Sequence, residues 1–149
     1  MTEFDRFLRW YCADLLNEGL RQASGQWLLC AALGLEPEHQ GLPAGLSFST
    51  ALLSPRAQPE PEPPVVFALP ADPQPLVVFA LWQPPPAQPL EPLAREQWLF
   101  WPVPRRQLHA ERQTIGLRPL LRAQGDGLSH GQLQIRLPEL MAGLAGDGH

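Results

Sequence analysis

The stretch VVFALPADPQPLVVFALW, residues 65–82, contains the pentapeptide VVFAL twice, at 65–69 and at 77–81. Both copies are β-branched and aromatic, lack alternating polar residues and are bounded by prolines, which is typical of strands with both faces covered. The link PADPQP has a length that favours a hairpin-type reversal over a crossover helix. Two copies are too few for a solenoid, so we interpret the repetition as convergent composition and predict a sheet between helices.

The N-terminal part, residues 1–36, is predicted to form two helices. Apolar residues between positions 4 and 16 recur at helical spacing, and Asn17 and Gly19 then interrupt the pattern. Gly34 supplies a stop for the second helix. The second helix is expected to turn these residues inward: Leu20, Ala23, Ser24, Trp27, Leu28, Ala31 and Ala32. The small residues among them suit close packing against a sheet.

Residues 46–104 are predicted to form strands separated by proline-rich loops. LSFSTALL, which begins at Leu46, alternates and predicts a half-exposed strand with Ser47 and Ser49 on its polar side. The loops at 55–64 and 83–92 carry most of the prolines. A proline-recognition groove of another protein could bind the first, acidic loop, although a plain extended loop is the simpler interpretation.

REQWLFWPVP, residues 95–104, predicts a further interior strand. Trp98 and Phe100 would face one side, and Leu99 and Trp101 the other. Proline cannot donate to a β-ladder, so the strand is expected to stop at the prolines of PVP.

The end of the chain, residues 105–149, is predicted to be mixed. RRQLHAERQ reads as a short polar helix or turn, and QLQIRL at 132–137 alternates as a strand would. Ser129 and Gln132 also form a capping-box pair for a helix that Pro138 would kink, and both interpretations stay open, with the strand favoured. The whole chain, 1–149, is therefore predicted to be a single α/β or α+β domain with its N-terminal helices packed on a central mixed sheet.

Composition excludes several functional classes. The net charge is −4, all eleven basic residues are arginine, and no lysine is present. We therefore expect no strong non-specific binding of nucleic acid and no attraction to an anionic membrane. The charged N-terminus has no signal-peptide pattern, and Cys12 and Cys30 lie among apolar residues, so we expect a cytoplasmic protein with reduced core thiols.

One catalytic motif is matched literally. GLSHG, residues 127–131, fits G-x-S-x-G, and Asp147 and His149 follow in the order that a hydrolase would need. A nucleophilic Ser129 requires a buried strand directly before it, and the preceding LRAQGDG does not resemble one. We interpret the match as a chance pentapeptide in a loop.

Metal and phosphate sites receive no support from the sequence. The histidines show no metal-ligand spacing and are expected at the surface or in the tail: His39, His109, His130 and His149. Arg105 and Arg106 lie beside two tryptophans and could bind a phosphate or a base, although an ordinary solvated turn is the preferred interpretation. We predict no catalytic residue, no cofactor-binding residue and no metal-binding residue.

Four segments, at 17–37, 75–82, 89–108 and 114–121, together resemble a known family. They are similar, in the same order, to an uncharacterised bacterial branch of the restriction-endonuclease-like, or PD-(D/E)XK, nuclease superfamily. The likeness covers roughly half of the chain. It implies a restriction-endonuclease-like core, in which NEGLRQASGQWLLCAALG corresponds to a helix, PLVVFALW to a strand, and PLEPLAREQWLFWPVPRRQL to a linker of the family.

The chain departs from that family where catalysis would occur. The family places its metal-binding segment and a V-E-V-K-S-S strand in an interval that here is only PEHQGLPAG, residues 37–45. Gln26 stands where the family has a helical glutamate, and no lysine is available to position the attacking water. Several acidic residues lie in predicted loops or at strand margins: Glu60, Glu62, Asp72, Glu91 and Glu96.

These departures predict a catalytically inactive nuclease-like domain that acts as an interaction or structural module with a protein partner. The alternatives are an adaptor that binds a partner through its proline-rich loops, and a hydrolase centred on Ser129.

Overall fold

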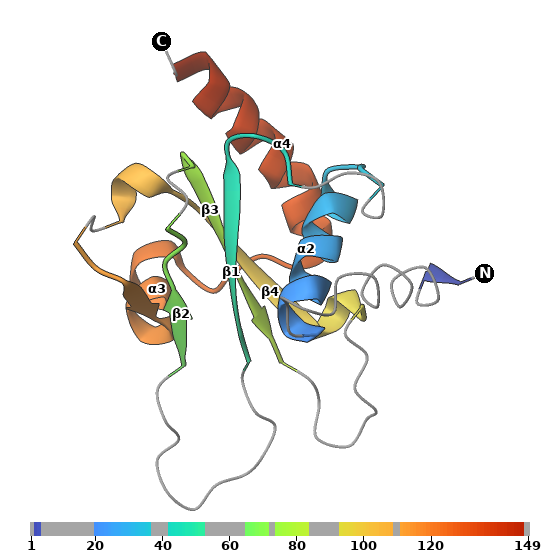
Figure 1. Cartoon of the computed structure of the whole chain (residues 1–149), viewed down its shortest axis with the longest axis horizontal. Helices are drawn as coiled ribbons and strands as arrows, with labels where there is room; N and C mark the ends of the chain where they lie inside the picture. Colours follow the sequence, from blue (N-terminus) through green and yellow to red (C-terminus); the bar gives the residue numbers. More distant parts are fainter. Residues whose placement is uncertain are drawn as a thin grey trace, which may run out of the picture.

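The computed structural model describes residues 2–3, 20–36, 42–52, 65–71, 74–83, 93–108 and 111–147. The elements follow in the order α2 (Leu20–Ala32), β1 (Leu46–Leu52), β2 (Val66–Ala68), β3 (Leu76–Trp82), β4 (Trp98–Pro104), β5 (Thr114–Gly116), α3 (Leu117–Gln124) and α4 (His130–Asp147) (Figure 1). Two 3-10 turns, η1 (Arg95–Gln97) and η2 (Arg105–Gln107), flank β4. The first predicted helix, Cys12, the loop at 55–64 and residues 84–92 lie outside the described residues.

β3 is the central strand of a three-stranded sheet with the order β1-β3-β4. β1 runs parallel to it, with Phe48 opposite Val78, and β4 runs antiparallel, with Trp101 opposite Phe79. β2 and β5 form a separate antiparallel pair. The predicted mixed sheet is therefore confirmed, and the fold belongs to the α+β class.

One face of the sheet, which we call the helical face, is covered by α2 and α4. Trp27 and Leu28 of α2 and Leu133 of α4 pack there against Val78 and other alternate residues of β3. At its closest point α2 requires a small residue, because a Cβ added to Gly25 would lie 2.7 Å from the side chain of Thr50. The predicted close packing of α2 on a sheet is thus confirmed, as is the stop at Gly34, whose φ of 76° is a left-handed conformation.

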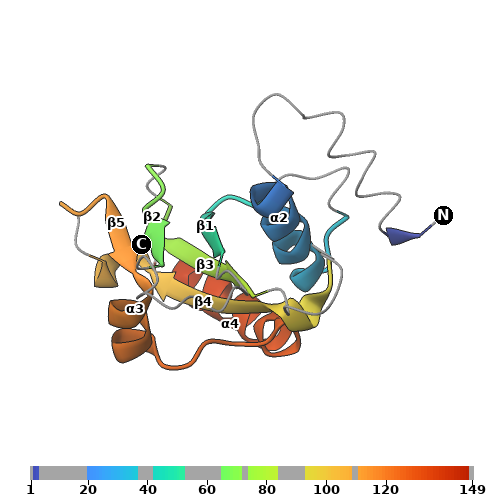
Figure 2. The ribbon, with the colours of Figure 1, turned by 90° about the horizontal axis from the view of Figure 1, so that it is seen from below.

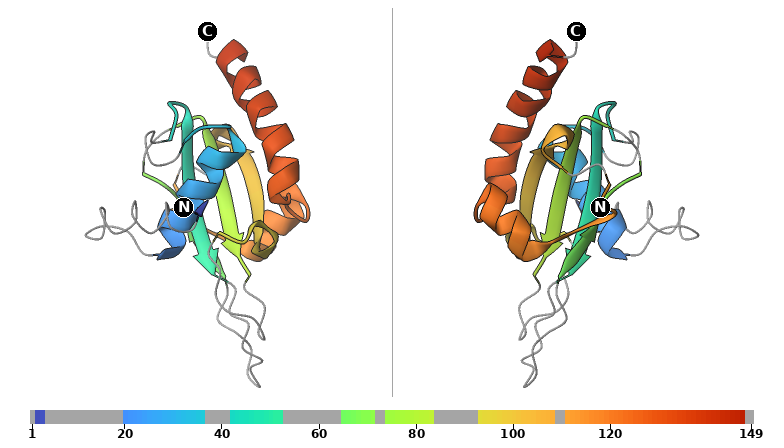
Figure 3. Two further views of the ribbon diagram at one scale, coloured as in Figure 1. Left: turned by 90° about the vertical axis from the view of Figure 1, so that its right-hand side faces the viewer. Right: turned by 90° about the vertical axis from the view of Figure 1, so that its left-hand side faces the viewer.

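The opposite face, which we call the hairpin face, is covered by β2, β5 and α3. Val77 and Phe79 of β3 pack there with Phe67 of β2 and Leu120 of α3. Figure 2 shows β2, β5 and α3 gathered at one end of the molecule, with α2 toward the other. The C-terminal end of α4 extends past the sheet in Figure 3.

The repeated pentapeptide does not form two equivalent strands. All seven residues of β3 are buried, as predicted, but in β2 only Phe67 is buried and Val66 is 44% exposed. The prediction of two covered faces is therefore wrong for the first copy. The two copies also do not pair as a hairpin, because β2 pairs with β5, whereas β3 pairs with β1 and β4. Only the second copy reaches the centre, where it has a neighbouring strand on both sides.

The predicted half-exposed strand is present as β1, but its polar side is buried. Ser47 is 5% exposed and Ser49 is 6% exposed. Ala51, on the same side of the strand, packs against the cluster of the hairpin face. The alternation of apolar residues and serines in LSFSTALL had predicted that this side of β1 is exposed to solvent. The pair of β2 and β5 covers it instead.

β4 is an edge strand and not the predicted interior strand, and it continues through both of its prolines. The odd-numbered residues of β4 form the hydrogen bonds to β3. The bonds at the two ends of the ladder show this pattern: the Arg105 amide donates to the Pro75 carbonyl, and the Gln83 amide donates to the Gln97 carbonyl. Phe100 bonds instead to Leu128 on the outer side, through N–O distances of 2.9 and 2.7 Å. Pro102 and Pro104 share the parity of Phe100, so their missing N–H groups fall on the outer edge and cost no ladder bond.

The segment 132–137 is helical, and the preference for a strand is wrong. The alternation had grouped Ile135 with Leu133 and Leu137, but Ile135 is 71% exposed while the other two are fully buried at i, i+4 spacing. α4 runs through Pro138 to Asp147. Among the described residues no helix is long and apolar enough to cross a membrane.

Candidate functional site

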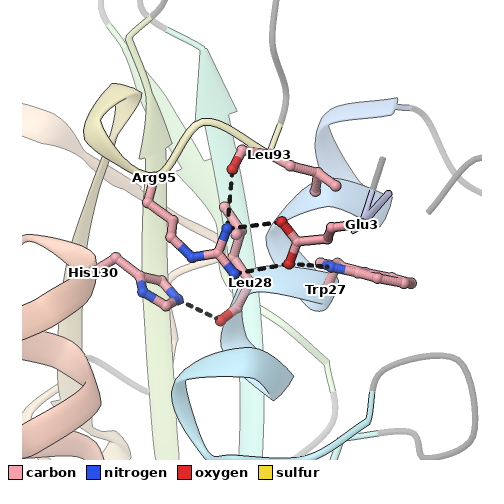
Figure 4. Close-up of polar contacts among 6 residues, drawn as sticks. All are labelled: Glu3, Trp27, Leu28, Leu93, Arg95 and His130. Atoms are coloured by element: carbon pink, nitrogen blue, oxygen red, sulfur yellow. Dashed lines mark hydrogen bonds and ion pairs between the residues drawn. The ribbon is translucent and has the colours of Figure 1, made fainter. Parts of the chain in front are cut away.

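Four polar side chains meet where α2, η1 and the start of α4 come together (Figure 4). We call Glu3, Trp27, Arg95 and His130 the Arg95 cluster. Arg95 donates from Nη1 to Oε1 of Glu3 at 3.0 Å and from Nη2 to Oε2 at 2.8 Å. Trp27 Nε1 donates to the same Oε2 at 3.3 Å, and Arg95 Nη1 also reaches the Leu93 carbonyl at 3.4 Å. The carboxylate of Glu3 is thus held by a two-pronged ion pair and an indole.

His130 lies beside this ion pair and is 7% exposed. Its Nε2 is 2.9 Å from the carbonyl oxygen of Leu28, and a carbonyl can only accept, so Nε2 carries the proton of the neutral ring. Burial lowers the pKa of His130, and the positive charge of Arg95 lowers it further. The bond to Leu28 and the charge of Glu3 act in the opposite direction and do not reverse the shift. The predicted surface position of this histidine is wrong.

The Arg95 cluster is arranged to hold segments together. The hydrogen bond to Glu3 raises the pKa of Arg95, which keeps the guanidinium charged. Both oxygens of Glu3 accept hydrogen bonds, and the proton of His130 is directed at a backbone oxygen. The cluster joins the N-terminus, α2, η1 and α4 by polar contacts, and its geometry supports a positioning role.

Ser129 caps α4. Its Oγ accepts from the amide of Gln132 at 3.2 Å, and its own amide donates to Oε1 of Gln132 at 2.9 Å, the reciprocal pair of a capping box. The next residue, His130, points to Leu28. The side chain of Asp147 and all of His149 lie outside the described residues. This arrangement is consistent with the interpretation of GLSHG as a chance match to the hydrolase motif, because the Ser129 hydroxyl caps the N-terminus of α4.

Arg105 and Arg106 have different surroundings. Arg105 donates from Nε to the Gln74 carbonyl and from Nη2 to the Pro70 carbonyl, both at 2.9 Å, so it fixes the turn before β3. The predicted solvated turn is therefore wrong for Arg105. Arg106 is exposed, as predicted.

The described residues contain no group of three or more histidine, cysteine, aspartate or glutamate side chains that could hold a metal ion. Glu96 is exposed in η1, whereas Glu60, Glu62, Asp72 and Glu91 lie outside the described residues, as do His39 and His109. Cys30 is buried as predicted, and its burial raises the pKa of the thiol and keeps it protonated.

A groove of about 530 Å³ lies against the outer edge of β4. The residues that line it include Pro102, Pro104, Arg106, Gln107, Gln124, Asp126 and Arg136. They come from β4, η2, the end of α3, the turn that follows it, and α4. The wall at 125–128 is fixed to β4, because Trp101 Nε1 donates to the Gly125 carbonyl at 3.0 Å and Leu128 bonds to Phe100.

Gly127 is needed for this wall to approach β4. Its φ is 89°, and a Cβ added to it would lie 2.8 Å from the indole ring of Trp101. We call the whole feature the β4 groove. Sequence reasoning singled out Arg106 but missed Arg136 and Asp126, because nothing in the sequence brings these three separate segments together.

No protein-family model, curated protein or solved structure matches this chain.

Proposed function

We propose that this chain is a catalytically inactive, nuclease-like domain that works as a protein-interaction module. The observation that carries the proposal is the β4 groove, a preformed depression that joins backbone of an edge strand to two arginines and an aspartate. Its volume of about 530 Å³ falls in the usual range for binding sites, and its wall at Gly125 is hydrogen-bonded to Trp101.

The non-catalytic part of the proposal is supported by the make-up of the sheet. β1, β3 and β4 present apolar residues, serine, threonine and proline. A metal-dependent nuclease needs clustered carboxylates to hold its ion against water. The resemblance to the PD-(D/E)XK superfamily suggests an ancestor that had them.

The interaction is tested by photo-crosslinking in the native host. In one variant a photoreactive residue replaces Gln107, which lines the β4 groove. In a second variant it replaces Val66, which is exposed on β2 and does not line the groove. We expect one defined protein adduct from Gln107, identified by mass spectrometry and reproduced with the purified partner. The absence of an adduct from both positions would overturn the proposal.

Catalysis is tested with purified protein, supercoiled plasmid, and Mg²⁺ or Mn²⁺. We expect no nicking beyond that of a Glu96→Ala variant. Metal-dependent nicking that disappears in Glu96→Ala would reveal an active site and would contradict the non-catalytic assignment.

A further inference from the structure

The β4 groove contains a backbone acceptor that no backbone donor reaches within the described residues. The carbonyls of alternate β4 residues point away from β3, and that of Phe100 is bonded by Leu128. The next carbonyl on this side belongs to Pro102, and no hydrogen bond to it is formed within the described residues. The carbonyl of Pro104 is already used, because Pro104 is the N-cap of the 3-10 turn η2 and its carbonyl accepts the first bond of that turn.

The charged side chains of the β4 groove favour an anion. Arg106 is exposed at one side, and Arg136 is exposed on α4 at another, with only a long 3.7 Å contact to Glu139. Asp126 is the one acidic residue that lines the groove among the residues that the structure describes. The groove thus carries a local excess of positive charge on a chain whose net charge is −4. Gln124 is an additional polar wall residue, held by a 2.9 Å bond to Gln107.

We infer that the β4 groove binds an extended acidic peptide segment of a partner protein. A peptide N–H group donates to the carbonyl of Pro102, and acidic side chains of the peptide pair with Arg106 and Arg136. This inference rests on the proposed interaction function and specifies the chemistry of the partner.

Nucleic acid fits the same groove less well. A phosphate backbone has no N–H donor for the Pro102 carbonyl, and that carbonyl and Asp126 repel it. A proline-rich ligand is disfavoured for the same reason, because it lacks the N–H groups. Full addition of a β-strand is also disfavoured, because neither proline can donate to the carbonyls of an added strand. The acidic extended peptide supplies a donor to the Pro102 carbonyl and carboxylates to the arginines.

The test uses three fluorescein-labelled hexapeptides and full-length protein, with binding followed by fluorescence anisotropy. The first peptide alternates glutamate and valine, the second alternates lysine and valine, and the third is the first with alternate amides N-methylated. We expect the acidic peptide to bind at least about tenfold more tightly than either of the others, and its affinity to fall as salt rises.

Matched double variants locate the site. Arg106→Gln with Arg136→Gln removes two charges from the β4 groove, and Arg118→Gln with Arg122→Gln removes two from exposed positions on α3. We expect the first pair to weaken acidic-peptide binding about tenfold or more and the second pair less than about threefold. Unchanged melting temperatures would show that both variants fold.

Equal losses in the two double variants would overturn the inference, as would equal affinities for the acidic and lysine peptides. Tighter binding of a single-stranded oligothymidylate, lost in the groove variant, would assign the site to nucleic acid instead. A crosslinked partner at Val66 without peptide binding in the groove would leave the proposed function standing and remove this inference.

Discussion

His130 shows how much of one residue's behaviour depends on distant parts of the chain. Its ring contacts Phe100 edge-on at a centroid distance of 5.9 Å and bonds to Leu28, 102 residues away in sequence. Burial and the charge of Arg95 both disfavour its protonation. As the first residue of α4 it also lies at the positive end of the helix dipole, where a cation is unfavourable.

Stability should therefore decline in mild acid. The pKa of His130 in the folded protein is below its ordinary value of 6.5, so the unfolded chain binds more protons. The stabilisation is complete above about pH 6.5 and is lost as the pH falls toward the lowered pKa. Urea unfolding of wild type and His130→Gln between pH 5 and pH 8 measures this, and the difference between the two should shrink as the pH falls. A difference independent of pH would contradict the lowered pKa.

The two valines at equivalent places of the repeated pentapeptide should respond differently to a charge. Val78 is fully buried, so Val78→Asp places an unpaired carboxylate in the core and should cost about 3 kcal/mol or more. Val66 is 44% exposed, and Val66→Asp should cost about 1 kcal/mol or less. The urea midpoints of the two variants, compared with that of wild type, measure the two losses of stability. Similar losses would mean that both copies are buried.

At the scale of elements, α4 illustrates a choice between two local patterns. The strand pattern of QLQIRL and the capping pair of Ser129 and Gln132 are both present in the sequence. The helix prevails because Leu133 and Leu137 then face the helical face together, with Leu140 and Met141 one turn further along. Pro138 is tolerated within this helix, at an exposed position.

Removal of the cap should weaken α4 and change no chemistry. Ser129→Ala should lower the free energy of unfolding by about 1 kcal/mol. Gln132→Ala removes the other half of the pair, so the losses of the two variants should be less than additive in the double variant. Wild-type protein treated with a fluorophosphonate probe should remain unlabelled, and a covalent adduct at Ser129 would contradict the capping role.

At the scale of the whole molecule, the Arg95 cluster joins parts of the chain that are 92 residues apart. Its ion pair is partly open to solvent, with side-chain exposures of 38% for Arg95 and 39% for Glu3. A double-mutant cycle with Glu3→Gln and Arg95→Gln should give a coupling energy of about 0.5–1 kcal/mol, which is reduced by salt. A coupling near zero at low salt would show that the ion pair does not hold the N-terminus.

Features of the fold that are determined by neighbouring residues in the sequence could be predicted from the sequence. The burial of β3, the boundary of α2 at Gly34 and the opposed faces of Trp98 and Trp101 follow from residue type and spacing, and they were predicted.

The exposure of Val66, the burial of Ser47 and the edge position of Pro102 depend on which distant element lies alongside, and they were missed. The β4 groove was missed for the same reason, because η2, the turn after α3, and α4 meet there only after folding.

The pairing of α2 with α4 on one face of the sheet sets an order of events during biosynthesis. Translation proceeds at about 5–20 residues per second, and the contact between Leu28 and His130 spans 102 residues. The apolar side of α2 therefore waits about 5 to 20 seconds for its helical neighbour while the strands between them are being made. During that interval Trp27 and Leu28 lack the contact with Leu133 and Leu137 of α4 that covers them in the folded protein. Exposure of apolar surface on the nascent chain is therefore expected to fall once α4 has emerged.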